Sequence, residues 1–220
     1  STVLRMYIRE VRFFENLAGQ SPIRVPAGYH GAVDLETSQF VQVMEDIGSM
    51  RMVDQNEGMN IDDAQRAVDE LAAWHAAFWR KADAPVDRGD VVCLSDPVYP
   101  AVLPMVFGEG WEKVNNAMDV DPVIASVGPG WVDWMPSALE RLSGAPNTIT
   151  HGDYRADNIL FDDEGNVVLL DFQLTGRGSA SYDLAYFVTQ SLAPDLAATH
   201  ETALFNRWLD GLIAAGVPEA

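Results

Sequence analysis

The sequence has little positive charge. Its 220 residues include 14 lysines and arginines against 33 aspartates and glutamates, so the formal net charge is −19. A surface with this excess of negative charge repels phosphate backbones and anionic lipid headgroups, which disfavours binding to nucleic acid or insertion into a membrane. The same charge would attract a cationic small molecule, and it also keeps a protein soluble.

Cysteine and long apolar runs are scarce as well. Cys93 is the single cysteine, so no disulfide forms within the chain, and we expect a cytoplasmic protein. No hydrophobic stretch reaches the length of a transmembrane helix, and the first residues carry no signal-peptide pattern. Because 48% of the residues are hydrophobic and 21% are charged, the chain is expected to bury a core.

The hydrophobic pattern predicts a mainly helical chain with a few short strands. Apolar residues three and four positions apart predict helices over residues 3–17, 60–82, 111–117, 131–142, 182–192 and 202–215. Alternating or β-branched residues predict strands over 40–44 and 148–150, and a hairpin with arms at 158–161 and 167–170. Prolines and glycines indicate a loop or edge strand over 21–31 and a long irregular connection over 83–104.

The most informative stretch of the chain surrounds the predicted hairpin. Asp153 and Asn158 lie on a short loop before it, and Asp171 follows its second arm. The hairpin would return Asp171 to the side of this loop, so that two carboxylates and an amide oxygen converge. Such oxygen ligands suit Mg²⁺, which takes further ligands from water and substrate phosphates. We expect Asn158 and Asp171 to hold Mg²⁺, and Asp153 to accept a proton from a hydroxyl that attacks phosphorus.

This stretch resembles the catalytic core of the protein-kinase-like phosphotransferases. Residues 151–158, HGDYRADN, fit the catalytic-loop pattern H-x-D-x-x-x-x-N, and residues 171–173, DFQ, stand where kinases carry D-F-G. The glycine in HGD and the glutamine in DFQ are similar to the aminoglycoside phosphotransferase and choline kinase group. The further segments DLAYF at 183–187 and LAAWHAAFW at 71–79 look most like the ecdysteroid-kinase-like branch of that group.

The resemblance implies an α+β, protein-kinase-like phosphotransferase fold. Residues 1–46 would be the remnant of a truncated small, nucleotide-binding lobe, and residues 47–220 a mainly helical large lobe with the catalytic β-hairpin. The implied reaction transfers the γ-phosphate of ATP, with Mg²⁺, to a hydroxyl of a small molecule. The acidic charge favours a cationic acceptor such as an aminoglycoside or choline, whereas the branch resemblance favours a steroid or another apolar alcohol.

The resemblance also implies roles for the residues around the hairpin. Asp153 is expected to be the catalytic carboxylate, and Asn158 and Asp171 to bind the metal and the nucleotide phosphates. His151 is expected to brace the catalytic loop rather than to react. Asp183 is expected to cap a helix and to support the same loop.

Nucleotide contacts in the first 46 residues follow from the same resemblance. Glu10 on the first helix is expected to pair with the lysine that contacts the α- and β-phosphates in such enzymes. Backbone groups near Met44, Glu45 and Asp46 are expected to meet the adenine.

Two parts of such an enzyme do not occur in the sequence. A glycine-rich loop and a strand lysine should precede Glu10, but the lysines of the chain, Lys81 and Lys113, both follow it. Because Asp153, Asn158 and Asp171 are all present, we expect a fragment of a longer sequence rather than a protein that has lost its chemistry. Without the loop and the lysine, the fragment should have little or no activity of its own. The alternative is a non-catalytic kinase-like binding module. A protein kinase is disfavoured because no A-P-E segment follows Asp171.

Several prominent side chains have structural interpretations. Arg155 either contacts a phosphate or forms a surface ion pair. His75 and Tyr154 are expected in the core. Four tryptophans are also expected there, with one or two of them lining an acceptor pocket: Trp74, Trp79, Trp131 and Trp134.

Overall fold

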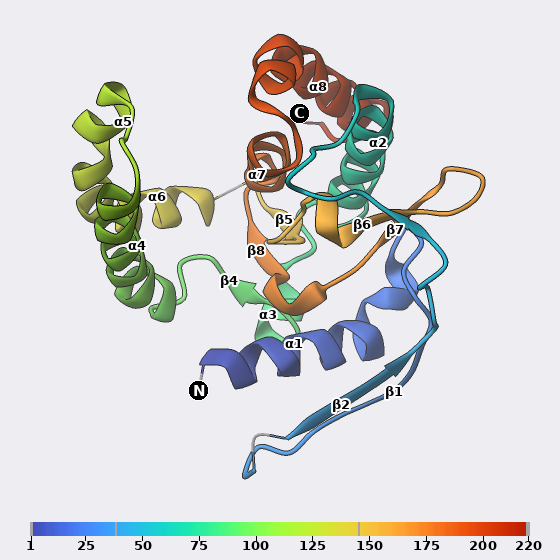
Figure 1. The fold of residues 1–220 in the computed structure, drawn as a ribbon. Coiled ribbons are helices and arrows are strands. Elements are labelled where there is room, and N and C mark those ends of the chain that lie inside the picture. Colours follow the sequence, from blue (N-terminus) through green and yellow to red (C-terminus); the bar gives the residue numbers. More distant parts are fainter. Residues whose placement is uncertain (1, 38, 145, 219–220) are drawn as a thin grey trace.

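The computed structural model describes residues 2–37, 39–144 and 146–218. The first helix and a long β-hairpin lie along one side of a group of short strands, and the helices of residues 61–77, 181–191 and 194–214 lie on the opposite side (Figure 1). The helices are α1 (Thr2–Asn16), α2 (Ile61–Ala77), α3 (Asp83–Arg88), α4 (Val98–Ala117), α5 (Pro122–Val127), α6 (Trp131–Leu142), α7 (Ser181–Ser191) and α8 (Pro194–Ala214). The 3-10 turns are η1 (Ala18–Gln20), η2 (Gly128–Gly130), η3 (Ala156–Asn158) and η4 (Phe172–Leu174).

The strands form three small sheets. One is the antiparallel pair β1 (Gly28–Val33) and β2 (Phe40–Met44). The second has the order β3-β6-β7, with strands β3 (Arg51–Met52), β6 (Ile159–Phe161) and β7 (Val167–Leu169). The third has the order β4-β8-β5, with strands β4 (Val92–Cys93), β8 (Gly176–Gly178) and β5 (Thr148–Thr150). Helices and small sheets together confirm the predicted α+β fold class.

The predicted catalytic hairpin is present. Strands β6 and β7 are antiparallel, with Ile159 opposite Leu169 and Phe161 opposite Val167. At the tip, the Asp162 carboxylate accepts hydrogen bonds from the backbone N–H groups of Glu164 and Asn166, which is the behaviour expected of a turn residue. The hairpin therefore returns the chain from the catalytic loop to Asp171, as the sequence predicts.

Helix α2 forms where the sequence predicts it and carries much of the core. The Asn60 side chain caps its first turn by accepting from the Asp63 N–H at 3.0 Å. One face is buried along Ala64, Val68 and Leu71, at the spacing of an amphipathic helix. The helix ends at Ala77, short of the expected residue 82.

Other predicted boundaries were wrong. Residues 83–104 are not an irregular connection, because they contain α3, β4 and the beginning of α4. Helix α4 starts at Val98 and continues through Pro104, so the helix expected over 111–117 is only its last part. Helix α8 begins at Pro194, which stands in the first turn where proline is tolerated, and not at residue 202. Residues 21–31, expected to form a loop or an edge strand, do so: a loop leads into β1, a strand of the two-stranded sheet.

Aromatic stacking joins α1 and α2 to the segment after the hairpin. The Phe172 ring is fully buried and stacks on Phe13 of α1, with ring centroids 3.6 Å apart and an interplanar angle of 9°. Trp74 of α2 lies 6.1 Å from each of these two rings. The core therefore fixes the residue that directly follows Asp171.

Helices α4, α5 and α6 stand to one side of this core (Figure 1). They pack mainly on one another, so their apolar faces stay partly open, and Trp131 and Trp134 are 43% and 48% exposed. The prediction that these two tryptophans belong to the core was therefore wrong. They line a cavity of about 520 Å³ together with Val127. Trp74, in contrast, is fully buried as predicted.

The β1–β2 hairpin is largely exposed to solvent. Tyr29 is 68% exposed, and Val41 and Val43 are 45% and 46% exposed. Tyr7 of α1 stacks on Phe40 with ring centroids 3.8 Å apart, which ties the hairpin to α1. The division into a small lobe of residues 1–46 and a large lobe of residues 47–220 stays a prediction. Within the described residues, no helix has both the length and the hydrophobicity to cross a membrane.

The aromatic stack generates a stability prediction. Replacing Phe13 with alanine removes a fully buried ring and opens a cavity beside Phe172, so the free energy of unfolding should fall by about 3–5 kcal/mol. Replacing the exposed Tyr29 with alanine is the control and should cost about 0.5 kcal/mol or less. Urea unfolding followed by circular dichroism measures both, and equal losses would contradict the role assigned to the stack.

Candidate active site

The catalytic loop runs from the end of β5 to η3, and its glycine is required by the backbone. Gly152 has φ of +86°, and a Cβ at this position would lie 2.2 Å from the carbonyl oxygen of Leu174. Only glycine fits both the conformation and the space. The H-G-D form of the loop therefore follows from its close approach to the segment after Asp171.

A buried carboxylate holds this loop from the side of α7. Asp183 Oδ2 accepts a hydrogen bond from the His151 backbone N–H at 2.7 Å, and Oδ1 accepts one from Gly152 at 2.9 Å. His75 Nε2 lies 3.0 Å from Oδ2, while His75 Nδ1 accepts from the Trp208 indole N–H at 3.0 Å. The His75 proton therefore sits on Nε2 and is donated to Asp183.

These contacts decide two of the predictions. Asp183 contacts the catalytic loop as predicted, but it does not cap α7, because the N-cap position is Ala180 and no side chain bonds there. The Asp183 carboxylate already accepts hydrogen bonds from two backbone N–H groups of the loop and from an imidazole. His75 is a fully buried core residue, as predicted, and it serves this carboxylate.

His151 links the loop to the far arm of the hairpin. Its Nε2 donates to the Leu170 carbonyl at 2.8 Å, and its Nδ1 accepts from the Asp153 N–H at 3.3 Å. Burial lowers the pKa of His151 below its usual value, against the opposing charge of Asp183. A neutral imidazole with both nitrogens bonded to backbone is placed to brace the loop.

Asn158 orients the Asp153 carboxylate. Its amide nitrogen donates to both the carbonyl oxygen and Oδ2 of Asp153, each at 2.9 Å. Asn158 is only 6% exposed, so this amide is held in place. Both N–H groups of the amide are therefore engaged, and the Asn158 Oδ1 atom is the part of the amide left to bind another partner.

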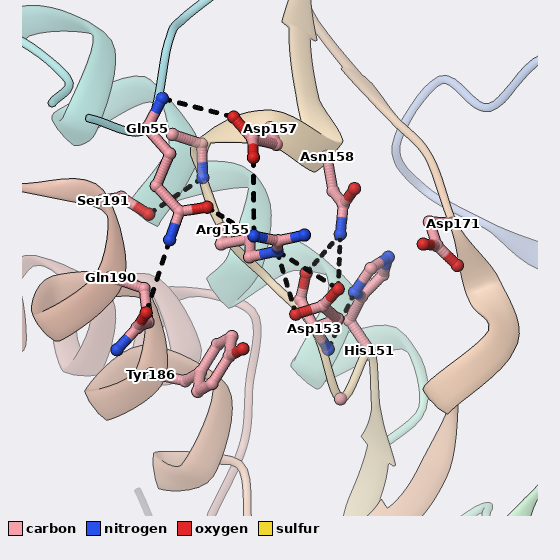
Figure 2. Close-up of polar contacts among 12 residues, drawn as sticks. Gln55, His151, Asp153, Arg155, Asp157, Asn158, Asp171, Tyr186, Gln190 and Ser191 are labelled. Atoms are coloured by element: carbon pink, nitrogen blue, oxygen red, sulfur yellow. Dashed lines mark hydrogen bonds and ion pairs between the residues drawn. The ribbon is translucent and has the colours of Figure 1, made fainter. Parts of the chain in front are cut away.

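Asp171 stands beside this pair. In Figure 2 it lies on the adjoining segment, next to Asn158 and on the far side of the His151 ring from Asp153. It is a non-glycine residue in the left-handed region, with φ of +59°, and its Oδ1 accepts from the Gln173 N–H at 3.3 Å. A strained backbone that positions a carboxylate is common at functional sites.

The oxygen ligands near the loop suit Mg²⁺ better than a metal ion that needs three or more protein ligands. Within the part of the chain that the structure describes, no three His, Cys, Asp or Glu side chains are arranged to hold a metal ion. The available set is the Asn158 Oδ1 atom and the Asp171 carboxylate. Mg²⁺ commonly takes one or two protein oxygens and completes its shell with water and phosphate.

Glu10 reaches the same neighbourhood from α1. Its Oε2 accepts from Gln173 Nε2 at 3.3 Å, two residues after Asp171. Burial, and then the negative charge of Asp171, raise the pKa of Glu10 above its usual value. Among the described residues no lysine or arginine forms an ion pair with Glu10, and a cation placed between it and Asp171 would relieve this repulsion.

The three residues expected at the adenine lie at the end of β2. Met44 closes the strand opposite Gly28, and the Glu45 N–H donates to the Ala27 carbonyl at 2.8 Å. The Glu45 carboxylate pairs with Arg24 at 2.8 Å, and Asp46 Oδ1 accepts from the N–H two residues ahead. Because the Glu45 N–H is already bonded within the hairpin, an adenine bound here would need hydrogen bonds from other backbone groups.

Sequence reasoning missed two side chains of the site and left a third undecided. Burial, and then the hydrogen bond and charge of Asp153, raise the pKa of Tyr186 to about 12, and its hydroxyl points toward Asp153 (Figure 2). Gln55, which follows β3, accepts a hydrogen bond from Arg155. Arg155 itself pairs with Asp153 at 3.2 Å. The motif DLAYF contains Tyr186, but no sequence signal marks Gln55.

Several solved phosphotransferase structures are similar to this fold. One is the macrolide 2'-phosphotransferase MphH from Brachybacterium faecium, with TM-score 0.53 and 17% identity over 97% of this chain and 66% of that one. A second is a putative aminoglycoside phosphotransferase from Ralstonia eutropha, with TM-score 0.58 and 22% identity over 93% and 64%. A third is the GDP and kanamycin complex of APH(2")-IIia, with TM-score 0.60 and 16% identity over 98% and 72%. These likenesses confirm the kinase-like phosphotransferase fold.

A family assignment follows from the sequence itself. The profile of the phosphotransferase enzyme family matches residues 4–216, and the chain belongs to this family. A search of curated proteins finds no match. The chain spans about two thirds of the length of the structures it resembles. The ecdysteroid-kinase-like branch stays a prediction.

The buried Asp183 generates the prediction for this site. Replacing Asp183 with asparagine keeps one acceptor oxygen but puts an N–H₂ group against the backbone N–H of either His151 or Gly152 and removes the buried charge, so the free energy of unfolding should fall by about 3 kcal/mol or more. Asp69, which forms an exposed pair with Arg207, supplies the control, and Asp69→Asn should cost about 1 kcal/mol or less. A wild-type unfolding curve for Asp183→Asn would show that the carboxylate does not hold the loop.

Proposed function

We propose that the protein transfers the γ-phosphate of ATP to a hydroxyl group of a small molecule. The observation that carries the proposal is the catalytic loop, in which Asn158 holds the Asp153 carboxylate by its amide nitrogen, while its amide oxygen, near Asp171, accepts no hydrogen bond from the residues that the structure describes. This arrangement supports a role for one carboxylate at the acceptor, and for the amide oxygen and the second carboxylate as ligands of Mg²⁺.

The phosphates would be held on the Asp171 side of the loop. Asn158 and Asp171 would hold Mg²⁺, which would supply positive charge to neutralise the charge that develops on the phosphoryl oxygens. Phe172 is fixed in the core, and the Asp171 carboxylate accepts a hydrogen bond from the Gln173 N–H. The Asp171 side chain would therefore need little reorganisation to bind the metal. The nearby Glu10 would pair with the phosphate-binding lysine that such enzymes carry on a strand before the first helix, and its contact with Gln173 beside Asp171 supports this role.

Asp153 would act on the acceptor. A bond forms between the acceptor oxygen and the γ-phosphorus, the bond to the bridging oxygen of ADP breaks, and the hydroxyl proton passes to Asp153. Asn158 would fix the carboxylate during this step, and Tyr186 lies next to it on the side away from Asp171 (Figure 2). The transfer needs little covalent help, so the work of these residues is orientation and charge stabilisation.

The acceptor is proposed only as a hydroxyl compound. Relatives in structure are named for aminoglycosides, macrolides and, in one case, glucosamine. The net charge of −19 favours a cationic acceptor, and the exposed Trp131 and Trp134 favour an apolar body. An amino sugar, choline and a steroid alcohol therefore belong in a first panel of acceptors.

A non-catalytic binding module is the second candidate. The like charges of Glu10 and Asp171, with no basic partner for Glu10 among the described residues, favour it. Release of ADP that requires both MgATP and an acceptor separates the two, because a binding module retains nucleotide without turnover.

The first prediction concerns Asp153. In the natural gene product that contains this chain, Asp153→Asn removes the proton acceptor but keeps the shape, so kcat should fall by about 10² to 10⁴ with little change in the KM for ATP. The exposed Asp163 at the hairpin tip is the matched control, and Asp163→Asn should leave kcat unchanged. A stable Asp153→Asn variant with nearly normal kcat would exclude the catalytic role.

The second prediction concerns Asp171. Asp171→Asn removes the negative metal ligand, so turnover should fall by about 10² or more and require more Mg²⁺. Titrating Mg²⁺ at fixed ATP measures the shift. An unchanged Mg²⁺ dependence would place the metal elsewhere.

A further inference from the structure

A cavity outside the catalytic loop lies between α1, α3 and β4, which are neighbours in Figure 1. Its volume is about 450 Å³, a size typical of sites for small molecules. Ile8 of α1, Val86 of α3 and Val92 of β4 give it apolar walls. Arg5 and Arg9 line the same cavity from α1. The residues to which the proposed phosphoryl transfer gives a role do not line it.

Arg9 is a buried cation whose hydrogen-bond partners carry no negative charge. The residue is 7% exposed, and its Nε donates to the Gln173 carbonyl oxygen at 2.7 Å. Tyr99 of α4 supplies a further side-chain hydrogen bond. Among the residues that the structure describes, no carboxylate forms an ion pair with Arg9. Because a buried charge is costly unless an opposite charge meets it, Arg9 lacks the partner that its position requires.

The groups around Arg9 leave its charge unbalanced. Burial lowers the pKa of Arg9 below its usual value, and the like charge of Arg5 lowers it further, while Tyr99 and Asp96 oppose this shift. Burial also raises the pKa of Tyr99 above its usual value, so its hydroxyl stays neutral. The Arg5 side chain is 61% exposed and lies 4.0 Å from the Asp96 carboxylate. An anion between the two arginines would relieve their repulsion and pair the buried charge.

We propose that this cavity is a binding site for a small organic anion. Arg9 and Arg5 would hold its carboxylate or phosphate group, and the apolar walls would contact the rest of the molecule. The Arg9 guanidinium is already oriented by Gln173, so its remaining N–H groups can form a charge-assisted pair with an oxyanion. The inference goes beyond the proposed function and does not depend on it, because the cavity shares no residue with the catalytic loop or the β6–β7 hairpin.

Asp96 offers a variant that should bind the anion more tightly. It lines the cavity beside Arg5, and its negative charge opposes an incoming anion. Its Oδ1 accepts a hydrogen bond from the Val98 N–H at 3.0 Å, a contact that an asparagine can keep. Asp96→Asn should therefore fold normally and tighten binding by about threefold, because it removes one partly exposed charge.

Calorimetry on the natural gene product tests the proposal with two probes, benzoate and phenyl phosphate. Mg·ADP at saturation keeps both probes away from the proposed nucleotide site. We expect at least one probe to bind the wild type. Arg9→Gln should weaken that binding by about tenfold or more, and the exposed Arg5→Gln by about threefold. A preference between the probes tells whether the natural ligand carries a carboxylate or a phosphate.

Arg207→Gln is the matched control. Arg207 pairs with Asp69 between α8 and α2, so this variant should bind the probes like the wild type. The inference is overturned if the wild type binds neither probe at millimolar concentration, or if Arg5→Gln and Asp96→Asn both bind like the wild type. These two variants decide the question even if Arg9→Gln does not fold. Binding of Mg·ADP alone, measured in the same way, tests the nucleotide site of the proposed function separately.

Discussion

The geometry of the candidate site depends on one buried negative charge. Asp183 is fully inaccessible to solvent, and it receives the backbone N–H groups of His151 and Gly152 together with the His75 imidazole. A buried carboxylate is tolerated only when its hydrogen-bonding capacity is met, so the loop must adopt the one conformation that presents both N–H groups. Helices α2 and α7 thereby set where Asp153 points.

The other half of the site is fixed by packing. Phe172 is stacked on Phe13 and holds the residue after Asp171 in the core, while Asp171 itself takes a left-handed backbone conformation beside the catalytic loop. His151 connects the two halves through the Leu170 carbonyl. A carboxylate held by polar contacts and another held by aromatic packing are therefore brought to one place by the β6–β7 hairpin.

The local parts of this arrangement could be predicted from sequence. The hairpin, the cap at Asn60 and the spacing of the catalytic loop are encoded within short segments, and all appear in the structure. The contacts of Arg155 with Gln55 join residues 100 positions apart, and only the fold brings them together. Trp131 and Trp134 were expected in the core because tryptophan is usually buried, yet α6 packs on α4 and leaves both exposed. Asp183 was expected at a cap because of its place in a helix, whereas tertiary contacts assign it to the loop.

The central claim is that this loop and hairpin move a phosphoryl group to a hydroxyl. The direct measurement is the fate of ATP labelled in its γ-phosphate, incubated with Mg²⁺, the natural gene product and a panel of amino sugars, choline and steroid alcohols. The account predicts that the label appears as a phosphate ester on an acceptor, with one ADP formed for each ester. If the protein binds ATP tightly but all of the label stays in ATP with every acceptor of a broad panel, the account is contradicted.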